Sequence, residues 1–429
     1  MALGADWDMQ VGHVDDGGTA SGTPQIVKVG WSATAAEMKA AVILTGLGTT
    51  INTENANSGF CIGATDGTNQ FSTCMVAEDG ADNPWVRGSN ARLVHMLNPV
   101  NGAIEYSSTF SQWIDTGIEL LTDVNSGADR PIGAFMFAGD LDVDLRKFTF
   151  ADDPSLGVNI GFTPELVIVF GTIAIAMDDT STKFNTMSIG AMSRVNGGTE
   201  QCCMAFTYQP ALPTPTAQNI QSYLDNSKVA AVLNDNAVYS TVTGTIQTDG
   251  YKLVDSSGAI ECFVLALKGT NRSIDARCRT SDIFVSAADN TIIRGGALNP
   301  IARMLGGLFA TADNTIQTGR RAGSYGFGFH TATDAFYASQ WMYENGLATP
   351  TDGVSVSVPL QQRGYNLFGT GTQLVKAAFP TGGAFPKYDR ASLDWDNVSA
   401  GARRMMDITI GKGPATIIHG GNLLGGTIY

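Results

Sequence analysis

The sequence is short of charge. Lys, Arg, Asp and Glu together make up 15% of the 429 residues, against roughly 25% in ordinary soluble domains. The charge is also one-sided, because 40 acidic residues outnumber 26 basic ones and give a formal net charge of −14. No run of Lys or Arg occurs, so the long-range electrostatic field would repel a polyanion. We therefore expect no nucleic-acid partner.

Long apolar runs are missing as well. No segment reaches the roughly 18 consecutive apolar residues of a membrane-spanning helix. The first residues, Met1 to Asp6, contain neither the basic nor the apolar part of a secretory signal. We expect no membrane insertion and no export through a signal peptide.

Cysteine and histidine, which supply many catalytic and metal-binding groups, are scarce. None of the cysteines is spaced as a CxxC pair, and we interpret all six as reduced, buried, small hydrophobic residues: Cys61, Cys74, Cys202, Cys203, Cys262 and Cys278. The four histidines are scattered, at His13, His95, His330 and His419, and we interpret them as structural. Because no HExxH, GxSxG or Cys-His pattern is present, we expect no enzyme, no catalytic residues and no cofactor.

Acidic clusters offer little more. Asp140, Asp142 and Asp144 place three carboxylates on one face of a predicted strand. The sixth position of this stretch is Leu145 rather than Gly, and no Glu closes a twelve-residue loop, so it is not an EF-hand. No metal site is predicted. The Asp pairs are interpreted as turn residues that cap local backbone; they are Asp15-Asp16, Asp152-Asp153 and Asp178-Asp179.

Tryptophans are the usual platform of a carbohydrate site. For a lone Trp in a β-rich protein, packing in a core or between domains is the simpler interpretation, and no sugar-binding residue is assigned. The candidates in irregular stretches are Trp85, Trp113, Trp341 and Trp395.

What the sequence does contain is β-forming and turn-forming residues. Thr, Ser, Asn and Asp supply the polar positions, and there are 50 glycines; these residues favour strands and turns over exposed helices. Helical signal is confined to short stretches at 31–41, where Thr34 and Glu37 form a capping-box pattern, at 216–233 and at 400–406. We predict an all-β protein.

One succession of segments occurs three times. Each copy opens with an apolar strand ending in Gly, at 41–46, 166–171 and 301–306. A strand of alternating small and apolar residues follows, at 59–64, 187–192 and 325–330, and then a third strand at 71–77, 200–206 and 335–340. A closing apolar strand again ends in Gly, at 132–139, 260–269 and 405–411. The period is about 130 residues, which indicates a tandem repeat.

The repeat predicts three tandem antiparallel β-sandwich modules, jelly-roll-like, with short helices in loops and seven or eight strands each. Module 1 with an N-terminal arm covers 1–145, module 2 covers 146–279, and module 3 with an apolar C-terminal tail covers 280–429. The opening and closing strands are apolar on both faces and should be central in their sheets. The alternating stretch 238–247 should have one face in water.

The stretch Val158-Asn-Ile-Gly-Phe-Thr-Pro-Glu-Leu-Val-Ile-Val-Phe-Gly171 resembles a recurring segment of tailed-phage virion proteins, in which Gly-Phe-x-Pro precedes an apolar strand. The resemblance continues through 187–190, 248–253 and 262–267, and so covers about 158–269. Copies one and three lack the Gly-Phe-x-Pro motif. The resemblance implies β-sandwich modules of an uncharacterised virion family rather than an activity.

Three fused modules could mimic a trimer and occupy a three-fold position on a capsid lattice. We therefore expect a non-enzymatic capsid decoration or cement protein, located in the virion after assembly in the host cytoplasm, with the major capsid protein or tail proteins as partners. A tail-fibre-associated or receptor-binding adhesin is the alternative, with a host surface glycan or receptor as its partner. A carbohydrate-binding or glycan-hydrolysing module is the third possibility. The apolar C-terminal residues 415–429 and the N-terminal arm up to about Asp16 are expected to dock on a neighbour or on the chain's own modules.

Overall fold

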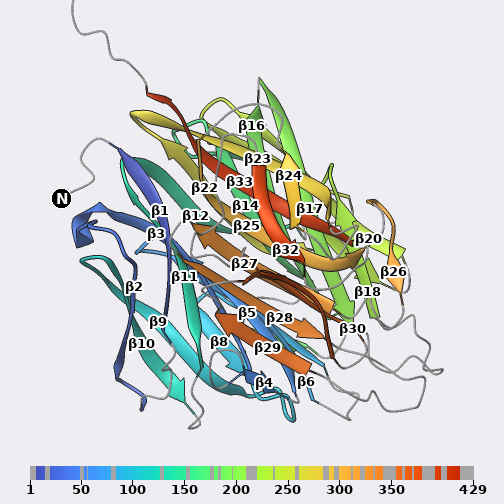
Figure 1. Cartoon of the computed structure of the whole chain (residues 1–429). Helices are drawn as coiled ribbons and strands as arrows, with labels where there is room; N and C mark the ends of the chain where they lie inside the picture. The colour runs from blue at the N-terminus through green and yellow to red at the C-terminus, as the bar shows by residue number, and fades with distance from the viewer. Residues whose placement is uncertain are drawn as a thin grey trace, which may run out of the picture.

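The computed structural model describes most of the chain. The described residues are 6–14, 20–48, 53–55, 57–78, 84–125, 130–150, 155–173, 178–181, 185–195, 197–208, 220–234, 237–256, 260–283, 289–293, 299–310, 313–318, 324–331, 334–341, 354–359, 363–369, 372–378, 392–397 and 403–415. Most of them lie in antiparallel strands (Figure 1), so the predicted all-β sandwich fold is confirmed.

The strands of the described ranges fall into three units of eleven, against the seven or eight expected. Unit 1 contains β1 (Trp7–Val14), β2 (Pro24–Lys28), β3 (Met38–Gly46), β4 (Thr53–Asn55), β5 (Ser58–Thr65), β6 (Gln70–Ala77), β7 (Trp85–Ser89), β8 (Val94–Leu97), β9 (Ile104–Ile114), β10 (Gly117–Asn125) and β11 (Ile132–Gly139). Unit 2 contains β12 (Leu141–Thr149), β13 (Ser155–Asn159), β14 (Leu166–Ile173), β15 (Thr180–Ser181), β16 (Asn185–Val195), β17 (Gly198–Tyr208), β18 (Ile220–Asp225), β19 (Ala230–Asn234), β20 (Ala237–Gln247), β21 (Gly250–Asp255) and β22 (Ile260–Gly269). Unit 3 contains β23 (Arg272–Ile283), β24 (Asp289–Ile293), β25 (Asn299–Ala310), β26 (Gln317–Thr318), β27 (Ser324–Thr331), β28 (Ala335–Trp341), β29 (Val354–Pro359), β30 (Arg363–Gly369), β31 (Thr372–Ala378), β32 (Ser392–Asn397) and β33 (Arg403–Ala415).

Each unit pairs a large inner sheet with a four-stranded outer sheet. In unit 1 the inner order is β1-β11-β3-β5-β6-β7 and the outer order is β2-β10-β9-β8; units 2 and 3 repeat both orders with their own strands. The opening strand (β3) and the closing strand (β11) are therefore central, as predicted. Strand β20 alternates between buried and solvent-facing residues, also as predicted.

Two of the three predicted helical stretches are wrong. The segment 216–233 contains β18 and β19, and 400–406 runs into β33. In the first stretch only Ala35–Glu37 is helical, as a 3-10 turn, and the Thr34–Glu37 capping box is present. Met38 then begins a strand. Packing on a sheet outweighs local helix propensity in these segments, because isolated short helices are marginal in water.

The predicted module boundaries need correction. The position after 145 falls inside β12, which pairs along its whole length with β22, and the position after 279 falls inside β23, which pairs with β33. The units instead meet at Asp140 and at Thr270-Asn271. The N-terminal arm is largely β1, which pairs with β11. The C-terminal segment 416–429 and Asp15-Asp16 lie outside the described residues.

The inner sheets are buried on both faces, since successive side chains point to opposite sides. In β14, Ile168 and Phe170 face a cluster shared by all three units, whereas Val167 and Val169 face the outer sheet of unit 2. We call the shared cluster the axial core. The sandwich cores lie between the two sheets of one unit; the described residues form one such cluster in unit 1 and two in unit 2.

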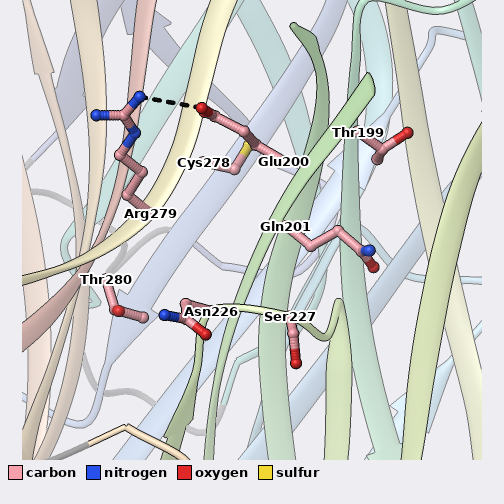
Figure 2. A pocket seen from close by; sticks show the side chains of 8 residues that line it. All are labelled: Thr199, Glu200, Gln201, Asn226, Ser227, Cys278, Arg279 and Thr280. Atoms are coloured by element: carbon pink, nitrogen blue, oxygen red, sulfur yellow. Dashed lines mark hydrogen bonds and ion pairs between the residues drawn. The ribbon is translucent and has the colours of Figure 1, made fainter. Parts of the chain in front are cut away.

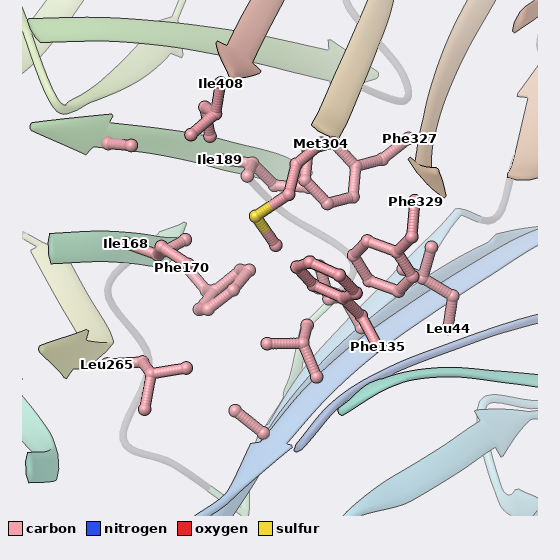
Figure 3. Close-up of a cluster of buried hydrophobic side chains, with 14 of the residues drawn as sticks. Leu44, Phe135, Ile168, Phe170, Ile189, Leu265, Met304, Phe327, Phe329 and Ile408 are labelled. Carbon is pink, nitrogen blue, oxygen red and sulfur yellow. The ribbon is translucent and has the colours of Figure 1, made fainter. Parts of the chain in front are cut away.

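The axial core brings equivalent positions of the three units together (Figure 3). Strand pairing makes Val42, Ile168 and Met304 equivalent. Phe135, Leu265 and Ile408 lie opposite them on the closing strands, and all six side chains are fully buried. Aromatic rings cross every boundary between units, through the pairs Phe71–Phe263 (6.0 Å), Phe206–Tyr325 (5.7 Å) and Phe135–Phe329 (5.2 Å).

The repeat in the structure is offset from the alignment suggested by the Gly at each opener, by one residue between each unit and the next. Gly63, Gly190 and Gly328 are the true equivalents, because they pair with Ile43, Val169 and Leu305. At each of the three, a Cβ would overlap neighbouring backbone or a ring. A one-residue shift exchanges the two faces of a strand, so only this register sends the large apolar residues into the axial core.

The three units also exchange strands in a closed cycle. Strand β15 of unit 2 pairs with β7 of unit 1, and β26 of unit 3 pairs with β18 of unit 2. Strand β4 of unit 1 closes the cycle on β29 of unit 3. Each exchanged strand follows the opening strand of its own unit and completes the seventh place in the inner sheet of another. The chain therefore forms a pseudo-three-fold ring.

Candidate functional site

An open polar pocket lies where units 2 and 3 meet (Figure 2). Its volume is about 470 Å³, within the range of small-molecule sites. The lining residues come from β17, from the turn after β18, and from β23: Thr199, Glu200, Gln201, Asn226, Ser227, Cys278, Arg279 and Thr280. Sequence reasoning nominated none of them for binding, because they come from three distant segments with no shared motif.

The pocket forms at an open edge of β17. Strand β18 pairs with β17 only from Cys203 to Tyr208, and then turns away at Asn226 and Ser227. Among the described residues no strand pairs with 198–202 on this side. Figure 2 shows the Thr199 and Gln201 side chains on one side of β17 and the Glu200–Arg279 pair on the other. The pocket thus wraps around a strand edge.

Ion pairs across the unit boundary fix one wall. Glu200 Oε1 accepts from Arg279 Nη2 at 3.0 Å and from Arg277 Nη1 at 3.4 Å. Arg277 also lies 3.7 Å from a carboxylate oxygen of Asp275. Burial raises the pKa of Asp275, the Arg277 charge opposes this, and the Glu200 charge adds to it. The pairing leaves the wall close to neutral and sets the guanidinium of Arg279 in place.

The exchanged segment of unit 3 supports the floor of the pocket. The backbone N–H of Asn314 donates to Leu224 O at 2.7 Å, and its side-chain amide nitrogen donates to the Asp225 carboxylate. Tyr223 and Ser227 also donate to the Asp225 carboxylate, and Thr280 donates to Asp313 at 2.7 Å. Burial, followed by the hydrogen bond and charge of Asp225, raises the pKa of Tyr223.

An equivalent contact, which we call the anchor, joins units 1 and 2, but here the side chain of the exchanged segment accepts the hydrogen bond instead of donating it. Asp178, which pairing makes equivalent to Asn314, donates its N–H to Gly88 O at 2.8 Å and accepts from Ser89 Oγ at 2.9 Å. Both residues have positive φ, 77° and 57°, a conformation that Asn and Asp tolerate. Asp178 therefore anchors a neighbouring unit rather than capping local backbone only.

The histidines lie apart from the pocket. His95 is buried on β8, with Nδ1 2.8 Å from Ser72 Oγ, and Ser72 donates to Arg92 O. Burial, then the charges of Arg87 and Arg92, lower the pKa of His95 to about 3, so it is neutral. His13 lies 3.1 Å from Asp334 across the unit 1–unit 3 boundary. His330 is buried on β27, and His419 is outside the described residues.

The carboxylates of Asp140, just before β12, and of Asp142 and Asp144, on β12, lie close to basic or amide side chains. Asp140 accepts from the backbone N–H and the side-chain amide of Asn271, Asp144 pairs with Arg146, and Asp142 lies 3.7 Å from Lys268. Over the described ranges, no group of three or more His, Cys, Asp or Glu side chains is placed to hold a metal ion. Asp152-Asp153 is outside those ranges.

Trp85 and Trp113 pack against other side chains and do not form an exposed platform. Trp85 Nε1 donates to Pro99 O at 3.1 Å, and Trp113 contacts Phe110 with ring centroids 4.8 Å apart. Both pack against the sandwich core of unit 1. The side chains of Trp341 and Trp395 are outside the described set.

The six cysteines are free and buried, as predicted. Burial raises the pKa of the Cys74, Cys203 and Cys262 thiols, which keeps them protonated and unreactive.

Comparison with known proteins adds no family. No protein-family model matches the chain, and no curated protein is significantly similar to it. In the part of the chain that the structure describes, no helix is long and apolar enough to cross a membrane.

Proposed function

We propose that this chain is a non-enzymatic structural protein of a tailed-phage virion, and that it decorates the exterior of the capsid. The observation that carries the proposal is the closed cycle of exchanged strands, in which β15, β26 and β4 each complete the sheet of another unit. One chain thereby presents three similar units around one axis.

A pseudo-three-fold chain suits a partner with three-fold symmetry. Three equivalent patches of a capsid lattice could each contact one unit, and the second and third contacts would form at high effective concentration. The major capsid protein is the partner that supplies such positions in a virion. The low charge and net charge of −14 suit protein contacts better than contacts with packaged nucleic acid.

The pocket supports a binding role rather than hydrolysis. Glycoside hydrolysis commonly uses two carboxylates on either side of the scissile bond. Glu200 is the single carboxylate among the eight lining residues, and it is held by Arg277 and Arg279. The eight lining residues therefore do not supply a pair of carboxylates for this reaction.

A tail-associated adhesin is the second candidate, favoured by the same pocket. An open, polar site at a unit boundary offers a surface that could recognise a host glycan or receptor. This role would need few copies at the tail rather than many on the capsid.

Quantitative mass spectrometry of purified virions distinguishes these roles. Copies on the order of tens to hundreds per particle are expected for a protein at repeated three-fold positions of a capsid. About three to twelve copies would instead match the symmetry of a tail and support the adhesin. Absence from washed virions would refute both structural roles.

A further inference from the structure

Equivalent glutamines at two unit boundaries use their amides differently. In unit 1, Gln70 Oε1 accepts from Phe110 N at 2.8 Å and Nε2 donates to Ala91 O at 3.0 Å. In unit 2, Gln201 Oε1 accepts from Gly244 N at 2.8 Å. The Nε2 group of Gln201 has no partner among the described residues and lies in the wall of the pocket. Both ends of the first amide are bonded inside the fold, and the nitrogen of the second is left to donate to a ligand.

The other groups in the pocket complete a mixed set of donors and acceptors. Asn226 and Ser227 are exposed on the turn after β18. The Asn226 amide and the Thr199 hydroxyl can donate and accept, and the Thr280 hydroxyl, which donates to Asp313, can still accept. Arg279 adds a donor whose charge is offset by Glu200 at 3.0 Å. A ligand with several neutral hydroxyl groups, each able to donate and accept, matches this inventory better than an anion or an apolar molecule.

The position of the pocket suits a ligand that arrives from outside. Over the described residues it opens at an unpaired strand edge between two units, and its wall is fixed by ion pairs and by the anchored segment of unit 3. The shape is therefore largely preformed, which lowers the entropic cost of binding.

We propose that this pocket binds one or two neutral sugar residues of a surface glycan. Gln201, Asn226 and Arg279 donate to sugar hydroxyls, and the Thr199 and Ser227 hydroxyls lie beside them. The site is independent of the location of the chain in a particle, because it lies within one chain.

The test uses the full chain on an array of neutral and charged glycans, followed by calorimetric titration of the best neutral ligand. We expect binding of neutral glycans that falls at least tenfold in Asn226→Ala and in Gln201→Ala. The matched control is Gln70→Ala, the equivalent glutamine of unit 1, which should leave the affinity unchanged. Thermal melting of every variant confirms that the fold is retained, and Asn226 is exposed, so its replacement should not unfold the chain.

Three outcomes would overturn the proposal. One is the absence of neutral-glycan binding at millimolar concentrations of the arrayed glycans in solution. Another is binding that survives the double change Asn226→Ala, Gln201→Ala. The last is competition by an extended peptide that protects the β17 amides from hydrogen exchange, which would identify the open edge as a site for strand addition instead.

Discussion

The axial core and the sandwich cores use the same strands but organise the molecule differently. A sandwich core joins the two sheets of one unit, as Val167 and Val169 do in unit 2. The axial core joins all three units through the alternate residues, such as Ile168 and Phe170. The inner sheets of units 1 and 2 thus each contribute to two cores. A unit separated from the others would have only its sandwich core to stabilise it and would expose its axial face to water.

This difference indicates that the folding unit is the ring rather than the module. Burying a large apolar side chain contributes roughly 1.5–3 kcal/mol, and the axial face of each inner sheet consists of such side chains. The exchanged strands add main-chain pairing between units. We therefore expect the three units to depend on one another for stability.

The largest expected effect is the loss of folding in a single unit. Residues 141–270 expressed alone should be insoluble or should lack a cooperative thermal transition, because the apolar axial face of unit 2 would be exposed. Circular dichroism melting and light scattering, with the full chain as control, measure this. A soluble monomer with a sharp transition would show that the sandwich core is sufficient.

A substitution in the axial core should have the next largest effect on stability. Gly133 lies against the ring of Phe336 in unit 3, and a Cβ at this position would overlap the ring. Gly133→Ala should therefore destabilise the chain by about 1–3 kcal/mol, as overpacking typically does. Gly30→Ala is the matched control, since nothing lies within 4 Å of its Cβ position. Equal denaturant midpoints for the two variants would contradict the close packing.

Acid should lower the free energy of unfolding through His95, which is buried on β8 in the outer sheet of unit 1. His95 has a folded-state pKa of about 3, below its ordinary 6.5, so the unfolded chain takes up the proton first as pH falls. The contribution of neutral His95 is complete above pH 6.5 and is lost as pH falls towards 3. At pH 4.5 the loss is about 2–3 kcal/mol.

The control for this prediction is His95→Gln, which cannot titrate. The variant should be less stable than the natural chain at pH 7 but should lose less stability between pH 7 and 4.5. Parallel pH profiles for the two proteins would show that His95 does not cause the acid sensitivity.

The smallest expected effect concerns an anchor of the exchanged strands. Ser89→Ala removes the hydrogen bond to Asp178 and should cost about 1 kcal/mol. Hydrogen exchange should increase at 178–181, where β15 pairs with β7. A double-mutant cycle with Asp178→Ala tests the pair, and strictly additive effects would mean that the anchor contributes nothing.

Much of the fold could be predicted from patterns along the chain. The triple succession of strands identified β3, β14 and β25 as openers and β11, β22 and β33 as closers, because strands buried on both faces are apolar throughout. The helical predictions at 216–233 and 400–406 failed because local propensity is weak compared with pairing in a sheet. The boundaries failed because Leu145 and Arg279 lie mid-strand, and nothing local distinguishes a strand that joins the preceding sheet from one that joins the next.

The pocket could not be predicted at all. Glu200, Asn226 and Arg279 come from separate strands and turns, and each is an ordinary polar residue in its own segment. Their meeting depends on how unit 3 lies against unit 2.

The sequence by itself determined the β-rich composition, the buried and unreactive cysteines, the repeat, and the acidic surface, because these depend on residue type and on spacing along one strand. Only the tertiary structure decided the register of the repeat, the exchange of β4, β15 and β26, and the axial core. The reason is physical: strand pairing between distant segments and the fit of three apolar faces are set by contacts far apart in the chain. A two-residue strand such as Thr180-Ser181 carries no local signal of the sheet it will complete.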